Sequence, residues 1–198
     1  MEVNDVNIHQ NVYDNDFPHI LQRKIVRRDV EMPDKKVFQF DILSQGNPSV
    51  VVFTFDTERK TTTLLKEYQP GPNQLLYGTV AGMYECGNGK HATALQCAQY
   101  ELEEEARLRS ERWIPLLNDE HTSIPFDKYS DNRFYLFLAL DCKSVENPRE
   151  RDEGEFIDVE HGVSKERLLD IINHGQMNVA SSFCILLGMQ KLSEMGYW

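Results

Sequence analysis

Cysteine is scarce in this chain of 198 residues, and none of its four cysteines stands in a C-x-x-C pair. That spacing argues against a zinc motif and against a disulfide framework, so we expect reduced thiols in a cytoplasmic protein. Apolar runs near 18 residues and a signal peptide are also missing. We therefore expect neither a membrane partner nor secretion.

Basic residues are the minority charge, since 21 lysines and arginines stand against 32 acids and give a formal net charge of -11. No basic run is present that could release counterions from a phosphate backbone, so we expect no nucleic-acid partner. A hydrophobic content of 40% suffices for a packed core. The length favours one domain, or one domain with a small appendage.

The chain does contain a dense group of acids. From Thr93 onward, apolar residues recur at steps of three and four, which predicts a helix with one apolar stripe formed by Leu95, Ala98, Leu102 and Ala106. At roughly 100° per residue, Glu101, Glu104 and Glu105 fall within an arc of about 100° beside that stripe, whereas Glu103 points away. Like charges at this spacing destabilise a helix by about 0.2 to 0.5 kcal/mol per pair. The cluster is thus either a solvated acidic face or a cation site.

The residues before this helix favour the cation site. A β-like run ends near Thr79, Ala81 and Gly82 follow it, and a loop with Gly87 and Gly89 leads to the helix. Such a loop would bring main-chain carbonyls near the start of the helix. Carbonyl and carboxylate oxygens beside a diphosphate are the ligands that Mg²⁺ uses.

The segment 79–108 resembles a Nudix box, whose pattern is G-x5-E-x7-R-E-U-x-E-E-x-G-U, where U is aliphatic. Residues 100–108, YELEEEARL, match its second half. The resemblance implies that Mg²⁺ (or Mn²⁺) is bound by the three glutamates of the box and by one carbonyl, which are Glu101, Glu104, Glu105 and the carbonyl of Ala81.

The first half of the box departs from the pattern, because the spacing from Gly82 to Tyr100 is about four residues too long and no glutamate stands at the earlier Glu position, although Glu85 is nearby. The second half departs at two places. Tyr100 stands where the box has arginine, and Arg107 stands where it has its late glycine. Upstream, residues 66–71, KEYQPG, are similar to the R-E-Y-R-P-G motif of ADP-ribose and nucleotide-sugar pyrophosphatases. This similarity implies that Gln69 and Gly82 contact substrate, with an amide at Gln69 in place of a guanidinium. Gly78 replaces a glutamate that is common in that branch.

A second acidic segment, 147–160, reads NPRERDEGEFIDVE. Composition alone favours a charged surface loop. Residues 152–159 are also similar to the E-x-E-x-I-x-V passage that carries the catalytic glutamate in the same branch. The resemblance implies that Glu153 is the base and that Glu155 is an auxiliary metal ligand or the alternative base. Arg133, which follows the polar loop 121–132, is a further candidate for substrate binding.

The pattern of apolar residues and turns predicts an α/β protein, with strands at 25–32, 37–42, 49–56, 61–68 and 134–140 and two helices that begin after Ser164 and Asn178. The resemblance covers about 24–192 and implies a Nudix α/β/α sandwich with a mixed sheet and an amino-terminal β subdomain. We expect a polar arm at 1–23, the β subdomain at 24–56 and the Nudix domain at 57–198. In this branch the β subdomain is exchanged across a homodimer.

The function implied by the resemblance is Mg²⁺-dependent hydrolysis of the diphosphate bond of ADP-ribose or another nucleoside diphosphate sugar. Two alternatives remain open. The departures at Gln69, Gly78, Tyr100 and Arg107 suit a Nudix-fold protein that binds a nucleotide or a protein partner with little turnover. The passage at 152–155 is also similar to that of UDP-sugar pyrophosphatases.

Overall fold

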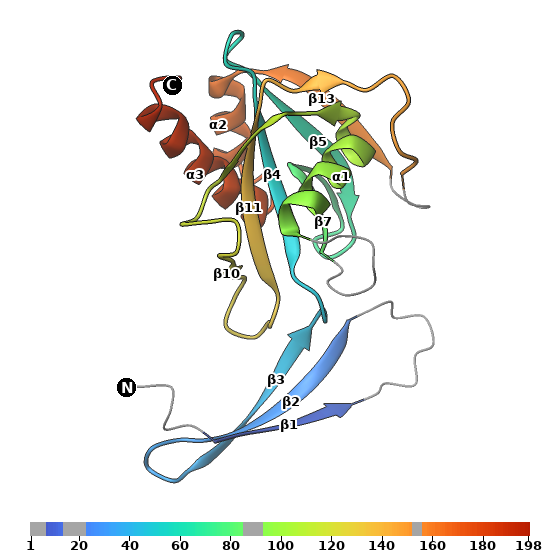
Figure 1. The fold of residues 1–198 in the computed structure, drawn as a ribbon. Coiled ribbons are helices and arrows are strands. Elements are labelled where there is room, and N and C mark those ends of the chain that lie inside the picture. The colour runs from blue at the N-terminus through green and yellow to red at the C-terminus, as the bar shows by residue number, and fades with distance from the viewer. Residues whose placement is uncertain (1–6, 14–22, 85–92, 152–155) are drawn as a thin grey trace. The chain divides into compact units, whose positions relative to one another are not determined.

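The computed structural model describes residues 7–13, 23–84, 93–151 and 156–198 (Figure 1). The chain forms two compact units, one of Met1–Pro48 with Ile124–Arg133 and the other of Ser49–Ser123 with Phe134–Trp198. This division differs from the expected one in that 49–56 belong to the larger unit. The reason is that the strand at 49–55 pairs with strands of the larger unit.

The smaller unit is an antiparallel sheet in the order β1 (Asn7–Tyr13), β2 (Lys24–Glu31), β3 (Val37–Ser44). Strand β1 comes from the expected polar arm and pairs with β2 from Asn7 opposite Glu31 to Tyr13 opposite Ile25. The segment 124–133, which begins with β10 (Ile124–Pro125), is tied to β3 by hydrogen bonds. One of them runs from the Leu43 amide to the Tyr129 carbonyl, at 2.8 Å.

The larger unit is built on a mixed sheet around β4 (Ser49–Phe55). Strand β4 is parallel to β11 (Arg133–Leu140) and antiparallel to β7 (Val80–Met83), and β9 (Arg112–Pro115) is antiparallel to β11. All seven residues of β4 are buried. A strand buried on both faces reads as a continuous apolar run, as VVVFTF does.

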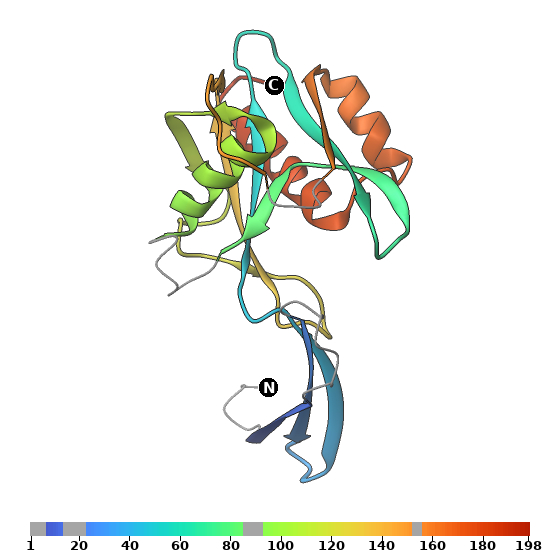
Figure 2. The same ribbon diagram turned by 90° about the vertical axis from the view of Figure 1, so that its right-hand side faces the viewer.

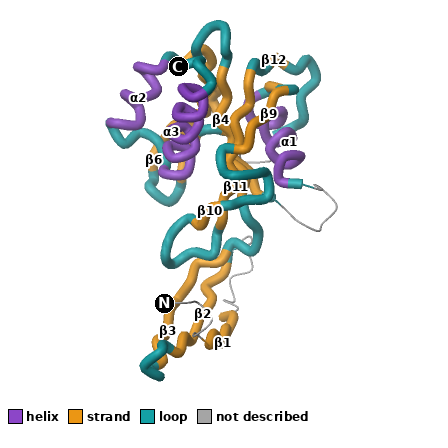
Figure 3. The backbone as a smooth tube through the Cα atoms, turned by 60° about the vertical axis from the view of Figure 1, so that its left-hand side comes forward, coloured by secondary structure: helices purple, strands orange, loops and turns teal. Residues whose placement is uncertain are grey.

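A second, antiparallel sheet has the order β13 (Ile157–Val163), β5 (Thr62–Gln69), β6 (Gln74–Gly78), and its orange, teal and green strands can be followed in Figure 2. The short strands β8 (Leu108–Arg109) and β12 (Lys143–Ser144) form a separate antiparallel pair. Among the described residues, all helices belong to the larger unit (Figure 3). They are α1 (Ala94–Ala106), α2 (Lys165–Asn173) and α3 (Val179–Glu194).

Each helix begins at a side-chain cap that its sequence provides. The hydroxyl of Thr93 accepts from the amide of Gln96, that of Ser164 from the amide of Arg167, and the Asn178 side chain from the amide of Ser181. Helix α2 ends before Gly175, whose φ of +66° is the left-handed conformation that glycine favours. The cap expected at Ser164 is therefore confirmed, and the helix expected after Asn178 begins there.

Helices α1 and α3 cover opposite faces of the sheet around β4 (Figure 1). Side chains alternate along a strand, so Val50 and Val52 join the core cluster of α1. Phe53 points to the other face, where it packs against Gly188 of α3. The expected α/β/α sandwich with a mixed sheet is confirmed. None of the described helices is long and apolar enough to cross a bilayer.

At Gly188, α3 approaches the Phe53 side chain of β4 closely, and its replacement tests this packing. A Cβ at Gly188 would lie 2.3 Å from Cδ1 of Phe53, a fully buried side chain. We predict that Gly188→Ala lowers the free energy of unfolding in urea by about 1 to 3 kcal/mol through overpacking. Gly71→Ala is the control, because a Cβ there meets nothing within 4 Å. Equal stability of Gly188→Ala and the parent would contradict the packing described.

Candidate active site

Helix α1 carries the acidic cluster. Its apolar side, which includes Cys97, Ala98 and Leu102, is buried in the core, and this fixes the rotation of the helix. Glu101 and Glu104 are consequently half-buried at one edge. Glu105 is almost completely buried, with 6% of its surface exposed.

Strand β7 places Ala81 and Gly82 against this edge of α1. Gly82 lies so close to the Glu101 carboxylate that a Cβ built on the glycine would be 2.0 Å from Cδ of the glutamate. The amide of Ala81 donates a hydrogen bond of 3.0 Å to Oε2 of Glu105. Four of the residues expected at the site therefore meet where α1 crosses β7.

The oxygen atoms at this edge are of the kind that bind a hard divalent cation. Within the described residues, no three carboxylate, imidazole or thiol groups converge into a closed ligand cluster. Mg²⁺ rarely needs one, because it keeps several waters and is bound through one or two carboxylates together with substrate phosphates. Gly82 also leaves the space that the Glu101 carboxylate occupies, and any larger residue would fill it. The carboxylates of α1 and the exposed edge of β7 at Ala81 thus fit such a cation.

The end of α1 is shaped by Arg107, which stands at the late glycine position of the box. It has φ +62° and ψ 30°, the left-handed conformation typical of a helix C-terminus, and its amide donates to the Leu102 carbonyl. Glycine adopts this conformation without cost. Arginine occupies it here, and its guanidinium donates a hydrogen bond to the carbonyl of Arg149.

The segment 145–151, which we call the strap, runs along the C-terminal half of α1. The Val145 amide donates to the Arg107 carbonyl at 3.0 Å. Arg151 donates from Nη2 to the Glu105 carbonyl at 2.7 Å and from Nη1 to the Ile157 carbonyl at 2.8 Å. Carbonyls in the last turn of a helix lack partners within the helix and carry partial negative charge. Arg151 therefore stabilises the end of α1 and links it to β13.

Arg149 contacts the side of α1 rather than its end. Its guanidinium carbon lies 3.9 Å from the centroid of the Tyr100 ring, within the range of a cation–π contact. Its Nε lies 3.8 Å from Oε1 of Glu103. Sequence analysis missed Arg149 and Arg151. Their alternation with acids in R-E-R-D was the available signal, but the segment looked like a solvated charged loop.

The remaining residues expected at the site are Gln69, Arg133, Glu153 and Glu155. Gln69 ends β5, is half-buried and donates from its amide to Glu67 at 3.3 Å. Glu67 is the register partner of Ile157, to which Arg151 also bonds. Arg133 is exposed and belongs to the smaller unit. Glu153 and Glu155, and the loop glycines at 87 and 89, lie outside the described residues.

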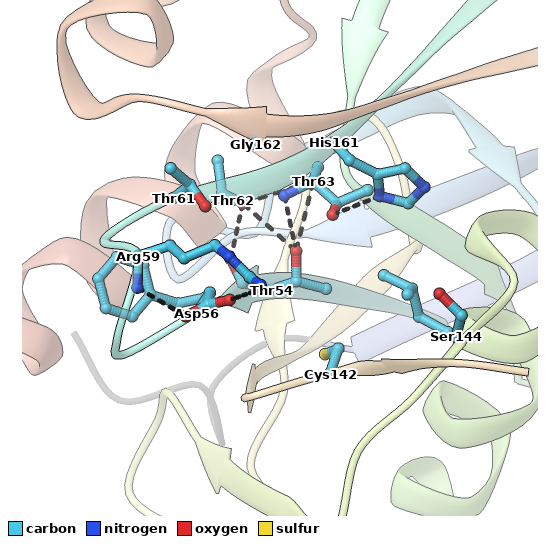
Figure 4. Close-up of a pocket in the computed structure, with 12 residues that line it drawn as sticks. Thr54, Asp56, Arg59, Thr61, Thr62, Thr63, Cys142, Ser144, His161 and Gly162 are labelled. Atoms are coloured by element: carbon cyan, nitrogen blue, oxygen red, sulfur yellow. Dashed lines mark hydrogen bonds and ion pairs between the residues drawn. The ribbon is translucent and has the colours of Figure 1, made fainter.

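A pocket of about 350 Å³ lies elsewhere in the larger unit and is drawn in Figure 4. None of the expected site residues lines it. Several of its polar groups bond to one another, as in the pairs Thr54–Thr62 at 3.3 Å and Thr63–His161 at 3.0 Å. Burial raises the pKa of the Cys142 thiol to about 12, so this thiol is protonated at neutral pH and is a poor nucleophile. We therefore place the candidate site at α1 and β7.

Comparisons with known proteins concern the family and the fold of the chain. A family model described as the NUDIX domain matches residues 46–179. An ADP-ribose pyrophosphatase of Bacillus subtilis (strain 168) is 28% identical over 131 residues, which are 66% of this chain and 65% of that protein. The match thus spans just under two thirds of that relative. The crystal structure of an ADP compounds hydrolase superposes with a TM-score of 0.77 at 15% identity and covers 100% of both chains, which shows a common fold.

The contact between Gly82 and Glu101 can be tested without a substrate. We predict that Gly82→Ala displaces the Glu101 carboxylate, because a flexible side chain gives way before the backbone does. The fold should remain intact, with a change in unfolding free energy within about 0.5 kcal/mol. Mn²⁺ should raise the Tm of the parent by mass action and raise that of Gly82→Ala clearly less.

The control for this variant is Gly78→Ala, whose Cβ would be 3.4 Å from Oγ of Ser181 and away from the acids. It should respond to Mn²⁺ as the parent does. Identical metal-induced shifts in the parent and in Gly82→Ala would mean that Glu101 does not bind the cation.

Proposed function

Because the chain belongs to the Nudix family, we propose that it hydrolyses the diphosphate bond of ADP-ribose or a related nucleoside diphosphate sugar. The products would be a nucleoside monophosphate and a sugar phosphate. The similarity to an ADP-ribose pyrophosphatase supports this class of substrate. The observation that carries the proposal is the meeting of β7 and α1, where Gly82 lies against the Glu101 carboxylate and Ala81 bonds to Glu105.

The proposed chemistry needs a divalent cation and a base. Mg²⁺ or Mn²⁺, when bound, would neutralise charge on the diphosphate and make water a stronger nucleophile. Glu101, Glu104, Glu105 and the Ala81 carbonyl would bind it. Of these, Glu105 is held in place by the Ala81 amide, and Glu101 has its space because residue 82 lacks a side chain.

In the proposed reaction, the water oxygen bonds to one phosphorus as the bond from that phosphorus to the bridging oxygen breaks. The bridging oxygen leaves with the second phosphate. Glu153 would take the proton of the attacking water, with Glu155 as an auxiliary metal ligand or as the alternative base. Sequence similarity supports both roles. Gln69, Gly82 and Arg133 are proposed to contact the substrate.

We also propose that the protein is a homodimer whose smaller units cover each other. Exposed apolar surface on a protein often marks a site of protein–protein contact. In the smaller unit, four large apolar side chains of β2 and β3 are 46% to 59% exposed, namely Ile25, Val37, Phe38 and Leu43. Because side chains alternate along a strand, Ile25, Val37 and Leu43 lie on one face of this sheet and Phe38 lies on the other. A second copy of the chain would bury the face with Ile25, Val37 and Leu43 in a symmetric contact.

The reaction is tested with a substrate panel and one isosteric variant. The parent should form AMP from ADP-ribose or ADP-glucose faster than it forms UMP from UDP-glucose, and only with Mg²⁺ or Mn²⁺ present. We predict that Glu104→Gln lowers kcat by at least about 100-fold, because the carboxylate that helps to bind the cation is lost. Its stability should hold or rise, since one like-charge repulsion is removed.

Glu111→Gln, which removes an exposed acid outside α1, is the matched control and should retain the parent's rate. Equal turnover by Glu104→Gln and the parent would reject the metal-binding role. A preference for UDP-glucose would correct the substrate, and binding without turnover across the panel would indicate a nucleotide-binding protein.

The dimer is tested by sedimentation or light scattering. We predict a mass of about 46 kDa, twice the 23.0 kDa of one chain. Val37→Lys should shift the mass toward the monomer, because a charge would be buried in the apolar contact. Val179→Lys, at an exposed valine of α3 in the larger unit, is the control. A monomeric parent, or dissociation only by Val179→Lys, would reject the proposed interface.

A further inference from the structure

Helix α1 concentrates negative charge without any cation of its own. Its thirteen residues, ALQCAQYELEEEA, include four glutamates and no lysine or arginine. All four acids lie in the C-terminal half, where the helix dipole also places partial negative charge. Four like charges within five residues repel one another at the i,i+3 and i,i+4 spacings. The compensating charge must therefore come from outside the helix.

The strap supplies that charge along one line of the helix. Tyr100, Glu103 and Arg107 fall within an arc of roughly 60° when the helix is viewed down its axis. Arg149 contacts all three, through its guanidinium to the Tyr100 ring and toward the Glu103 carboxylate, and through its carbonyl to the Arg107 guanidinium. One strap residue is thus held at three places on the same side of α1.

This contact line borders the edge that carries the proposed metal ligands. Glu104 lies about 40° beyond Tyr100 around the helix, and Glu101 and Glu105 lie about 100° and 140° beyond it, next to the buried Ala98 and Leu102. The acidic edge is therefore flanked by the core on one side and by Arg149 on the other. Rotation of α1 about its axis would break contacts on both sides.

We infer that Arg149 is a positioning residue for the acidic edge of α1, with the Tyr100 ring as its platform. It acts through the helix, by neutralising Glu103 and by holding α1 in the orientation that presents Glu101 and Glu104. Arg149 of the strap thus provides a guanidinium beside α1, which contains no arginine. This inference rests on the proposed binding of a divalent cation by those acids.

The direction in which Mn²⁺ affinity changes when Arg149 is removed separates a positioning residue from a cation that merely lies near the acids. A bystander cation near the acids repels a divalent ion, so its removal would tighten metal binding. A positioning residue has the opposite effect, because its removal lets the acids spread and repel one another. Residues that support metal ligands in this way typically change metal affinity by about 10-fold to 100-fold when removed.

The experiment measures Mn²⁺ binding by calorimetry, without substrate, for the full chain and its variants. We expect Arg149→Ala to weaken Mn²⁺ binding by about 10-fold. Arg149→Lys should recover only part of the loss, since it keeps the charge but lacks the planar group that stacks on Tyr100. Arg109→Ala, at an exposed arginine of β8, is the matched control and should bind as the parent does.

A double variant tests whether a guanidinium placed elsewhere on this line of α1 restores Mn²⁺ binding. Arg149→Ala combined with Tyr100→Arg places a guanidinium on the same line of α1, and it should restore most of the Mn²⁺ affinity. Urea unfolding of each variant shows that the folded state is retained. Tighter or unchanged Mn²⁺ binding by Arg149→Ala, or a loss of stability without a loss of affinity, would overturn the inference.

The Mn²⁺ titration and the hydrolysis assay can fail independently, so the two proposals are tested separately. If the parent binds Mn²⁺ and hydrolyses no diphosphate, the reaction is rejected, and the same titration still decides the role of Arg149. If the parent binds no Mn²⁺, the inference is rejected with the metal site.

Discussion

The site depends on the electrostatic cost of crowding four glutamates into the second half of a helix that has no basic residue. Such a helix would not be stable in isolation. Its apolar side is buried against β4 and β7, which fixes its rotation. From outside the helix, the Ala81 amide bonds to the Glu105 carboxylate and Arg149 lies near that of Glu103. Core packing and charge compensation thus act on the same helix from different sides.

The sheet beneath the helix makes this arrangement precise. Alternate residues of β4 pack against α1 on one face of the sheet and against α3 on the other. One fully buried strand therefore orients both helices. Strand β7 pairs with β4 so that Ala81 lies opposite Val51 and Gly82 opposite Val50. The register between these two strands therefore decides which residues of β7 meet the acids of α1.

Much of this could be predicted from local sequence signals. Period-two and period-four patterns and the cap at Ser164 indicated the main strands and all three described helices. The placement of β4 in the larger unit could not be predicted, because an apolar run does not reveal its neighbours. Strand β1 was hidden by a polar composition. Arg149 and Arg151 were missed because their partners in and at the end of α1 lie more than 40 residues away along the chain.

The double contact of Arg151 has a consequence for how such a protein can diversify. Its guanidinium bonds to the carbonyl of Glu105 in α1 and to that of Ile157 in β13. One side chain thus holds the end of the helix and the start of the strand together. A change in either element must be accommodated by the other, so the two cannot diversify independently.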